Sequence, residues 1–227
     1  MTPSDRKEFE GAALFRNLSP EVRDCLAKKA VVRDYPRGST IGLQGDEACS
    51  LKLILSGWVK LYRVASNGEE AILETLDRGQ SFDELAALDG AESSSSAEAL
   101  TDVRLLHLDL QAICQCDRAR SEIHAVVLRA AAAHLHKLTN QVEQLKIRTT
   151  TDRLVGFLAE LSATHQDADE IELPYGKVAL AGKLGMKPES LSRAFAKLKS
   201  IGIVSDLRRV IIADRKAFHA YRQQAGF

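Results

Sequence analysis

The sequence predicts an α+β protein built from three parts. Residues 1–116 are expected to form a β-roll of the jelly-roll type, residues 117–149 one long helix, and residues 150–227 a winged helix-turn-helix. Three observations support this prediction. Short strand-like runs recur between residues 31 and 109, the segment 117–149 lacks Gly and Pro, and a tight turn joins two helical patterns near the C-terminus.

The composition is typical of a soluble globular protein with two modest domains. The chain has 227 residues, of which 45% are hydrophobic and 27% charged. No apolar run approaches the roughly 20 residues that a membrane-spanning helix needs, and the first residues lack the apolar segment of a signal peptide. We therefore expect a cytoplasmic protein that does not enter a membrane.

An introductory helical segment precedes the expected roll. It runs from Phe9 to about Lys29, with Ser19 as an N-cap and Pro20 in the first turn that follows. Asn67-Gly68 is a hairpin signal between two of the strand-like runs. Many short strands at even spacing favour a jelly roll or a barrel. The expected strands are Val31–Tyr35, Thr40–Leu43, Lys52–Leu55, Trp58–Val64, Ala71–Leu76, Ala97–Leu100 and Val103–Leu108.

The four cysteines are expected to be thiols without a metal. They are Cys25, Cys49, Cys114 and Cys116. A cytosolic chain rarely uses disulfides, and a lone Cys-x-Cys matches the paired spacings of zinc or iron–sulfur sites poorly. Redox sensing through Cys114 and Cys116 is the alternative.

The long helix carries two apolar stripes. The first recurs at alternating spacings of four and three over about three heptads, as in the seam of a coiled coil. We expect this seam to pair two chains as a parallel homodimer, whereas the second stripe, Ile123, Val127 and Ala130, faces the roll. The alternative is a helix buried within one subunit. The seam consists of His124, Leu128, Ala131, Leu135, Leu138, Val142 and Leu145.

The segment from Pro174 to Val204 predicts a helix-turn-helix. Ala179, Leu180 and Leu184 give the first helix its apolar face, and the second helix repeats apolar residues at helical spacing from Leu191. Gly185 is suited to the positive φ that ends a helix. Pro188 is suited to the first turn of the next one. The second helix of such a unit enters the major groove of DNA.

The front of the second helix carries side chains that can read bases. Glu189, Ser192 and Arg193 are spaced at i, i+3 and i+4 and therefore share one face. A glutamate can accept from cytosine, and an arginine can donate two hydrogen bonds to guanine. The alternative is an ordinary surface ion pair between Glu189 and Arg193.

The charge distribution favours DNA binding at the C-terminal end. Residues 174–209 hold eight basic and two acidic residues, a net charge of +6, whereas residues 1–110 hold thirteen basic and nineteen acidic residues, a net charge of −6. Phosphate contacts should therefore be local and dependent on salt. The expected phosphate contacts are Lys177, Lys187, Ser190, Lys197, Lys199, Arg208 and Arg209, the last two at the tip of a wing between strands 203–205 and 210–213.

Two polar segments are expected to be connections. The run Ser93–Ser96 predicts a flexible surface loop, and His165–Asp169 predicts a linker between a helix that begins near Thr151 and a short strand at 171–173. A short helix is expected from Asp214 onward.

Over nearly its whole length the sequence resembles the CRP/FNR superfamily of bacterial transcription regulators. The strongest local matches are LSGWVKLYR at residues 55–63 and GMKPESLSR at residues 185–193. The resemblance implies a cyclic-nucleotide-binding-like roll, a homodimer on a palindrome, and RNA polymerase as a protein partner. The E-x-x-S-R pattern is similar to that of the FNR branch, which implies that Glu189, Ser192 and Arg193 read a half-site like TTGAT or TTGAC.

Departures from the family pattern concern the signal. Members that bind cyclic AMP use a Gly-Glu pair and then an Arg-Ser pair, where this chain has Asp83-Glu84 and a serine run without the arginine. A buried phosphate without a cation is costly, so cyclic AMP is not expected. The oxygen sensors hold an iron–sulfur cluster with an N-terminal cysteine group, where this chain has only Cys25, so that cofactor is not expected either.

The remaining pattern is similar to the nitric-oxide-responsive regulators of denitrification, which implies haem as one candidate cofactor. Glu84 and His107 are the residues that we assign to the effector pocket, although His107 also suits a packed strand. A dimer controlled by another protein, or by no ligand, is the main alternative. No catalytic motif is found, and a cupin-like metal enzyme would need more histidines on the strands than His107 alone.

Overall fold

The computed structural model describes residues 1–113, 117–164, 170–206 and 208–224. The chain divides into two compact units, Met1–Leu138 and Thr139–Phe227. Cys114, Cys116 and the expected linker at 165–169 lie outside the described residues, as does Leu207 at the expected wing tip.

The N-terminal segment forms two α-helices joined by a short 3-10 turn. Ser19 is the N-cap of the second helix, as predicted, and its hydroxyl accepts a hydrogen bond from the backbone N–H of Val22 at 3.5 Å. The first helix is joined to the roll by a buried carboxylate, because Arg104 donates to both oxygens of Asp5 at 2.8 and 3.0 Å. The three elements are α1 (Pro3–Gly11), η1 (Ala13–Phe15) and α2 (Pro20–Lys29).

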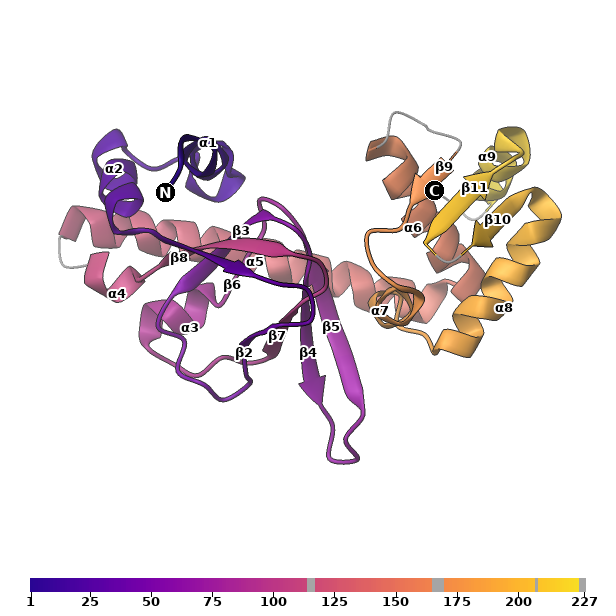
Figure 1. Cartoon of the computed structure of the whole chain (residues 1–227), viewed down its shortest axis with the longest axis horizontal. Helices are drawn as coiled ribbons and strands as arrows, with labels where there is room; N and C mark the ends of the chain where they lie inside the picture. The colour runs from indigo at the N-terminus through magenta and orange to yellow at the C-terminus, as the bar shows by residue number, and fades with distance from the viewer. Residues whose placement is uncertain (114–116, 165–169, 207, 225–227) are drawn as a thin grey trace. The chain divides into compact units, whose positions relative to one another are not determined.

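Two four-stranded antiparallel sheets form the roll, and all seven expected strands are present (Figure 1). The strand order is β1-β8-β3-β6 in one sheet and β2-β7-β4-β5 in the other. The predicted hairpin at Asn67-Gly68 joins β4 to β5, with Gly68 at a φ of +80°. The strands are β1 (Val31–Tyr35), β2 (Thr40–Gly42), β3 (Leu51–Ser56), β4 (Val59–Val64), β5 (Glu70–Leu76), β6 (Ser81–Phe82), β7 (Ser96–Ala99) and β8 (Val103–Leu108).

The serine run is not a surface loop, contrary to the prediction. Ser93, Ser95 and Ser96 are buried, and the Ser96 hydroxyl accepts a hydrogen bond from the backbone N–H of Gln44 at 3.0 Å. The run leads directly into β7, whose first residue is Ser96, and so belongs to the roll rather than to a surface loop. The sequence also gave no signal for two short helices, α3 (Glu84–Asp89) and α4 (Leu110–Ile113).

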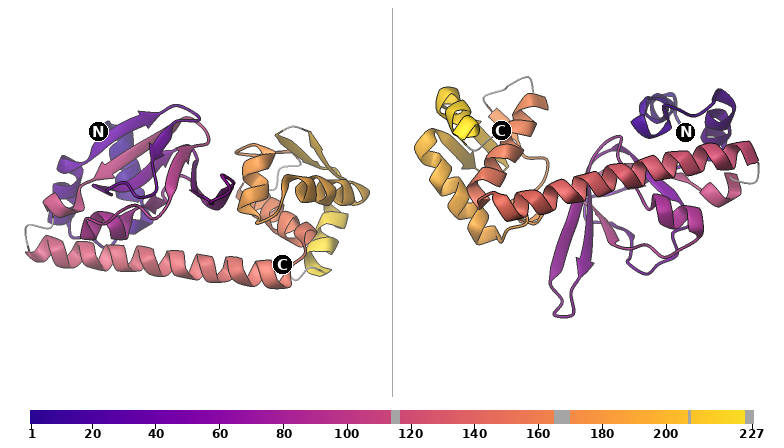
Figure 2. Two further views of the ribbon diagram at one scale, coloured as in Figure 1. Left: turned by 90° about the horizontal axis from the view of Figure 1, so that it is seen from below. Right: turned by 180° about the vertical axis from the view of Figure 1, so that it is seen from behind.

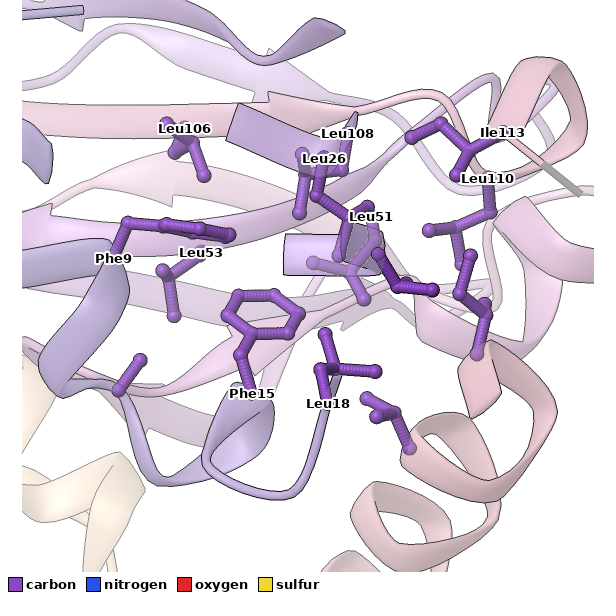
Figure 3. Packing of buried hydrophobic residues seen from close by; sticks show 14 of the residues in the cluster. Phe9, Phe15, Leu18, Leu26, Leu51, Leu53, Leu106, Leu108, Leu110 and Ile113 are labelled. Carbon is purple, nitrogen blue, oxygen red and sulfur yellow. The ribbon is translucent and has the colours of Figure 1, made fainter. Parts of the chain in front are cut away.

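A continuous core joins the N-terminal helices, the first sheet and the long helix α5 (Asp117–Ile147). Figure 3 shows Phe9, Phe15 and Leu26 packed against leucines of β3 and β8. Ile123 and Val127 of α5 belong to the same core, and Ala130 is also buried. The prediction that this stripe faces the roll is therefore confirmed, and α5 runs along one side of it (Figure 2).

The second unit contains the predicted winged helix-turn-helix. A three-stranded sheet of order β10-β11-β9 lies beside the helices, and no helix among the described residues is long and apolar enough to cross a membrane. The elements after α5 are α6 (Thr150–Thr164), β9 (Glu170–Glu172), α7 (Lys177–Lys183), α8 (Pro188–Leu198), η2 (Lys199–Ile201), β10 (Ile203–Asp206), β11 (Arg209–Ile212) and α9 (Arg215–Gln224).

Candidate nucleic-acid interface and effector cavity

A tight turn with left-handed backbone joins α7 to α8. Gly185 has a φ of +59°, and the N–H of Met186 reaches back to the carbonyl of Ala181 at 2.9 Å. Pro188 occupies the first turn of α8, where its missing N–H has no cost. The turn chemistry expected from the sequence is confirmed.

Two side chains of the same unit fix this turn. Arg153 on α6 donates to the carbonyl of Gly185 at 3.3 Å. A Cβ at position 185 would lie only 2.6 Å from Cδ2 of Leu145, near the end of α5. Gly185 is therefore required both for its φ and for the close approach of α5, and the second requirement left no signal in the sequence.

One face of α8 is buried and the opposite face is polar. Leu191, Ala194, Phe195 and Leu198 are buried against the rest of the unit, which leaves the base-reading set on the other side. Because the apolar residues recur at helical spacing, burying them fixes which face of α8 points to solvent. Glu189, Ser192 and Arg193 are all exposed, as the expected base contacts must be.

Arg193 is oriented by its own helix. Its guanidinium donates to the hydroxyl of Ser190 at 3.3 Å, whereas the hydroxyl of Ser192 donates to the carbonyl of Pro188 at 3.0 Å. No ion pair joins Glu189 to Arg193 among the interactions of the described residues. Both charged groups therefore remain available for a partner.

The expected phosphate contacts fall into two groups. Lys187, Lys197 and Lys199 are exposed at the two ends of α8. Ser190 is half-buried and holds Arg193, as described above. The exposed lysines give the helix a positive rim on which phosphates can bind.

Two other basic residues hold the wing instead. Lys177 lies 5.4 Å from the centre of the Phe195 ring and donates to the hydroxyl of Ser205, and Arg208 donates to the carbonyl of Pro174 at 2.8 Å. Arg209 is more exposed and pairs with Glu170 at 3.3 Å. Of the two wing arginines, Arg209 is therefore the better placed to contact phosphate.

The expected seam of α5 is open to solvent in the single chain. Leu128 and Leu135 are 67% and 66% exposed, and Leu138, Val142 and Leu145 are each about half exposed. Ala131 is half-buried at the edge of the roll. Exposing large apolar side chains along one helix face to water costs free energy. Packing against a partner helix would bury this seam.

A cavity of about 430 Å³ lies within the first unit, between the roll and α5. Its apolar wall includes Leu61 and Phe82, and α5 contributes Ala131, His134 and Leu138. Two of these, Ala131 and Leu138, also belong to the seam. A molecule in the cavity would therefore contact the residues through which two chains are expected to pair.

The cavity is lined by carboxylates and by no lysine or arginine among the described residues. Glu84 is 5% exposed; its Oε1 accepts from the hydroxyl of Ser81 at 2.5 Å, and its Oε2 lies 4.0 Å from Nδ1 of His134. Glu84 lines the cavity, as the sequence predicts, whereas His134 is a lining residue that the sequence analysis did not assign to it. The acidic residues are Glu74, Asp83, Glu84, Asp89 and Glu92.

Asp83 adopts a backbone conformation that suits glycine. Its φ is +61°, and it stands at the position where the family pattern has the Gly of a Gly-Glu pair. Lys52 donates to its carboxylate at 2.6 Å, and both side chains are almost fully buried. This ion pair was not foreseen, because Lys52 is distant in sequence.

His107 does not line the cavity, so the structure separates the two residues that were assigned to one pocket. It lies in β8, where Nε2 is 3.2 Å from the hydroxyl of Tyr35 and Nδ1 is 3.2 Å from that of Ser50. Burial, together with the charges of Lys52 and Arg33, lowers the pKa of His107 to about 4. It is thus a neutral strand histidine, and the described residues contain no group of three His, Cys, Asp or Glu placed to hold a metal.

Comparisons with known proteins agree with both halves of the structure. The Cyclic nucleotide-binding domain family matches residues 32–117, and the Crp-like helix-turn-helix domain family matches residues 152–221. The chain is 27% identical to the CRP-like cAMP-activated global transcriptional regulator of Mycobacterium tuberculosis, over 89% of this chain and 93% of that protein. It is also 27% identical to the Global nitrogen regulator of Synechocystis, over 88% and 89% of the two chains.

A solved structure is similar over the full length. A protein of Ruegeria pomeroyi, provisionally named as a cyclic nucleotide binding protein, is 37% identical, covers 97% of each chain and superimposes with a TM-score of 0.68. The two family matches cover the roll and the reading unit, and these relatives align with both halves of the chain. The chain belongs to the CRP/FNR family of DNA-binding transcription regulators.

Proposed function

We propose that this regulator acts as a homodimer that reads a palindrome of TTGAT- or TTGAC-like half-sites. The observation that carries the proposal is the exposed face of α8, where Glu189, Ser192 and Arg193 lie together above a buried apolar face. Glutamate and arginine suit a C·G pair, because one accepts from cytosine N4 and the other donates to guanine O6 and N7.

The exposed seam of α5 supports the dimer. In a parallel pair, each recognition helix would meet one half-site, with half-site centres about one helical turn apart. We propose that such a dimer acts in the cytoplasm and has RNA polymerase as its protein partner.

Fluorescence anisotropy tests the DNA site. One labelled duplex carries two inverted TTGAT half-sites with centres one turn apart, and a control duplex has both half-sites scrambled at equal composition. We expect at least about 10³-fold tighter binding to the first duplex at physiological salt. Equal affinity for the two duplexes would reject the assigned half-site.

We further propose that the signal at the roll is neither cyclic AMP nor an iron–sulfur cluster. The cavity presents buried Glu84 but no lysine or arginine among its described lining residues, so a phosphate there would face carboxylates without a cation. Cys25, which stands in the N-terminal segment, packs against the apolar core. Adding cyclic AMP should therefore leave the DNA affinity unchanged, and a tenfold gain would refute this part.

Haem fits the cavity poorly. The lining offers one imidazole, His134, that could hold the iron, but its other ionisable side chains are five carboxylates, and no lysine or arginine among the described lining residues would pair with the two negatively charged propionates. His107 is enclosed by Tyr35 and Ser50 and is not oriented into the cavity. A signal of other chemistry, or a protein partner that binds the roll, therefore agrees better with the lining.

A further inference from the structure

A second cavity of about 340 Å³ lies within the first unit, on another side of α5 from the seam. The segment that follows α1, the turn between β5 and β6, and α5 form its walls. Arg129, Ala133 and Lys137 recur every four residues and therefore share one face of α5. The seam residues follow a different face, so a parallel dimer would leave this cavity open.

The two cavities are lined by side chains of opposite charge. The cavity beside the seam is lined by five carboxylates, whereas the second is lined by Arg129 and Lys137 and by no carboxylate among its described residues. Lys137 is already paired with Glu74 of β5. Arg129 is exposed and makes no hydrogen bond or ion pair with the described residues, so its guanidinium is the free charge of the site.

Neutral donors accompany that charge. The side-chain oxygen of Gln80 accepts from the N–H of Asp77 at 2.8 Å, which leaves its NH₂ group to donate elsewhere. Asn17 is exposed at the rim and offers a second amide, and Leu14 provides an apolar surface. A planar guanidinium flanked by amides is the set of donors that recognises a carboxylate or a phosphate.

We propose that this second cavity binds a small metabolite that carries an oxyanion, either a carboxylate or a phosphate, through Arg129 with Asn17 and Gln80. His134 lines both cavities, and it lies 4.0 Å from the buried Glu84. An anion in the second cavity would therefore lie beside a residue that also lines the first cavity. The site is independent of the DNA half-site proposed above.

Isothermal titration calorimetry with the full-length protein tests the site. Pyrophosphate and citrate serve as separate probes, which distinguishes a phosphate site from a carboxylate site. We expect at least one of them to bind, and Arg129→Ala to weaken that binding at least tenfold. Arg37→Ala is the matched control, because Arg37 is also an exposed arginine of the first unit and does not line the cavity.

A third variant separates this site from the DNA-reading face, which also attracts anions. Arg193→Ala should leave the affinity for the probe unchanged. Loss of binding in Arg193→Ala with none in Arg129→Ala would assign the anion to the DNA face and overturn the proposal. Failure of both probes to bind at millimolar concentration would overturn it as well.

Discussion

Arg193 is the residue on which base reading depends most directly. Arg193→Ala removes two donors to one guanine, so we expect it to cost about 1–3 kcal/mol on the palindrome and to relax the preference at that base. Lys199→Ala is the control, since an exposed lysine on phosphate should weaken specific and random DNA alike. Anisotropy titrations with both duplexes measure this, and equal losses for Arg193→Ala on the two would contradict its role.

Asp83 combines a left-handed backbone conformation with a buried ion pair to Lys52. Glycine would relieve its left-handed conformation, yet Asp83→Gly would leave the buried ammonium of Lys52 without its carboxylate. We expect Asp83→Gly to lower the free energy of unfolding by about 3 kcal/mol, because breaking a buried ion pair is costly.

The double variant Asp83→Gly with Lys52→Met should recover most of that loss, since it removes both charges. Urea unfolding followed by the fluorescence of Trp58, the chain's one tryptophan, reports on the first unit. A double variant no more stable than Asp83→Gly would show that the ion pair is not the reason that aspartate stands at this position.

His107 should make the first unit sensitive to mild acid. Burial lowers its pKa to about 4 in the folded chain, against about 6.5 when unfolded. The unfolded chain therefore binds the proton more tightly, and the stability that is present above pH 6.5 is lost as the pH falls toward 4. We expect a loss of roughly 1–3 kcal/mol between pH 7 and pH 4.5 that His107→Gln does not show, measured by urea unfolding at each pH.

At the scale of elements, periodicity accounts for most of what the sequence could predict. All seven expected strands, the hairpin at Asn67-Gly68 and both helices of the reading unit are where local pattern placed them. The prediction for residues 93–96 was wrong because serine occurs both in surface loops and at buried positions. The burial of this run follows from its connection to β7 and not from its own composition. The short β6 and α3 were missed because six residues or fewer carry too little periodicity.

The seam of α5 should determine the oligomeric state. Leu135→Lys places a charge on an apolar position of the expected pair and should shift sedimentation from dimer to monomer, with at least a hundredfold loss of affinity for the palindrome. Ile147→Lys makes the same change at a residue that is 74% exposed but lies off the seam spacing, and it should remain a dimer. Dimers of unchanged stability in Leu135→Lys would refute the seam.

At the scale of the whole molecule, the sequence could predict the uneven charge but not the cavities. Each cavity is made by segments distant in sequence, so Glu84 could be assigned from a pattern whereas His134 and Arg129 could not. Charge totals, by contrast, need no tertiary information. The net charges of +6 and −6 at the two ends of the chain are read directly from the residues.

This uneven charge predicts how DNA binding responds to salt. Phosphate neutralisation releases counterions, so affinity should fall at least about a hundredfold between 50 and 200 mM salt, although the net charge of the whole chain is zero. Lys197→Ala combined with Lys199→Ala should reduce the slope of log K against log salt by about two. An affinity independent of salt would show that these lysines do not face phosphate.

The contact between Leu145 and Gly185 has a consequence for engineering. Leu145 belongs to α5 by sequence, yet its side chain fills the space that a Cβ at position 185 would need. A hybrid regulator that grafts this reading unit onto another sensor should therefore be joined ahead of Leu145, near the division at residues 138–139, and not at the start of α6. A junction at Thr150 would supply a foreign side chain at position 145 and leave the turn before α8 without its counterpart.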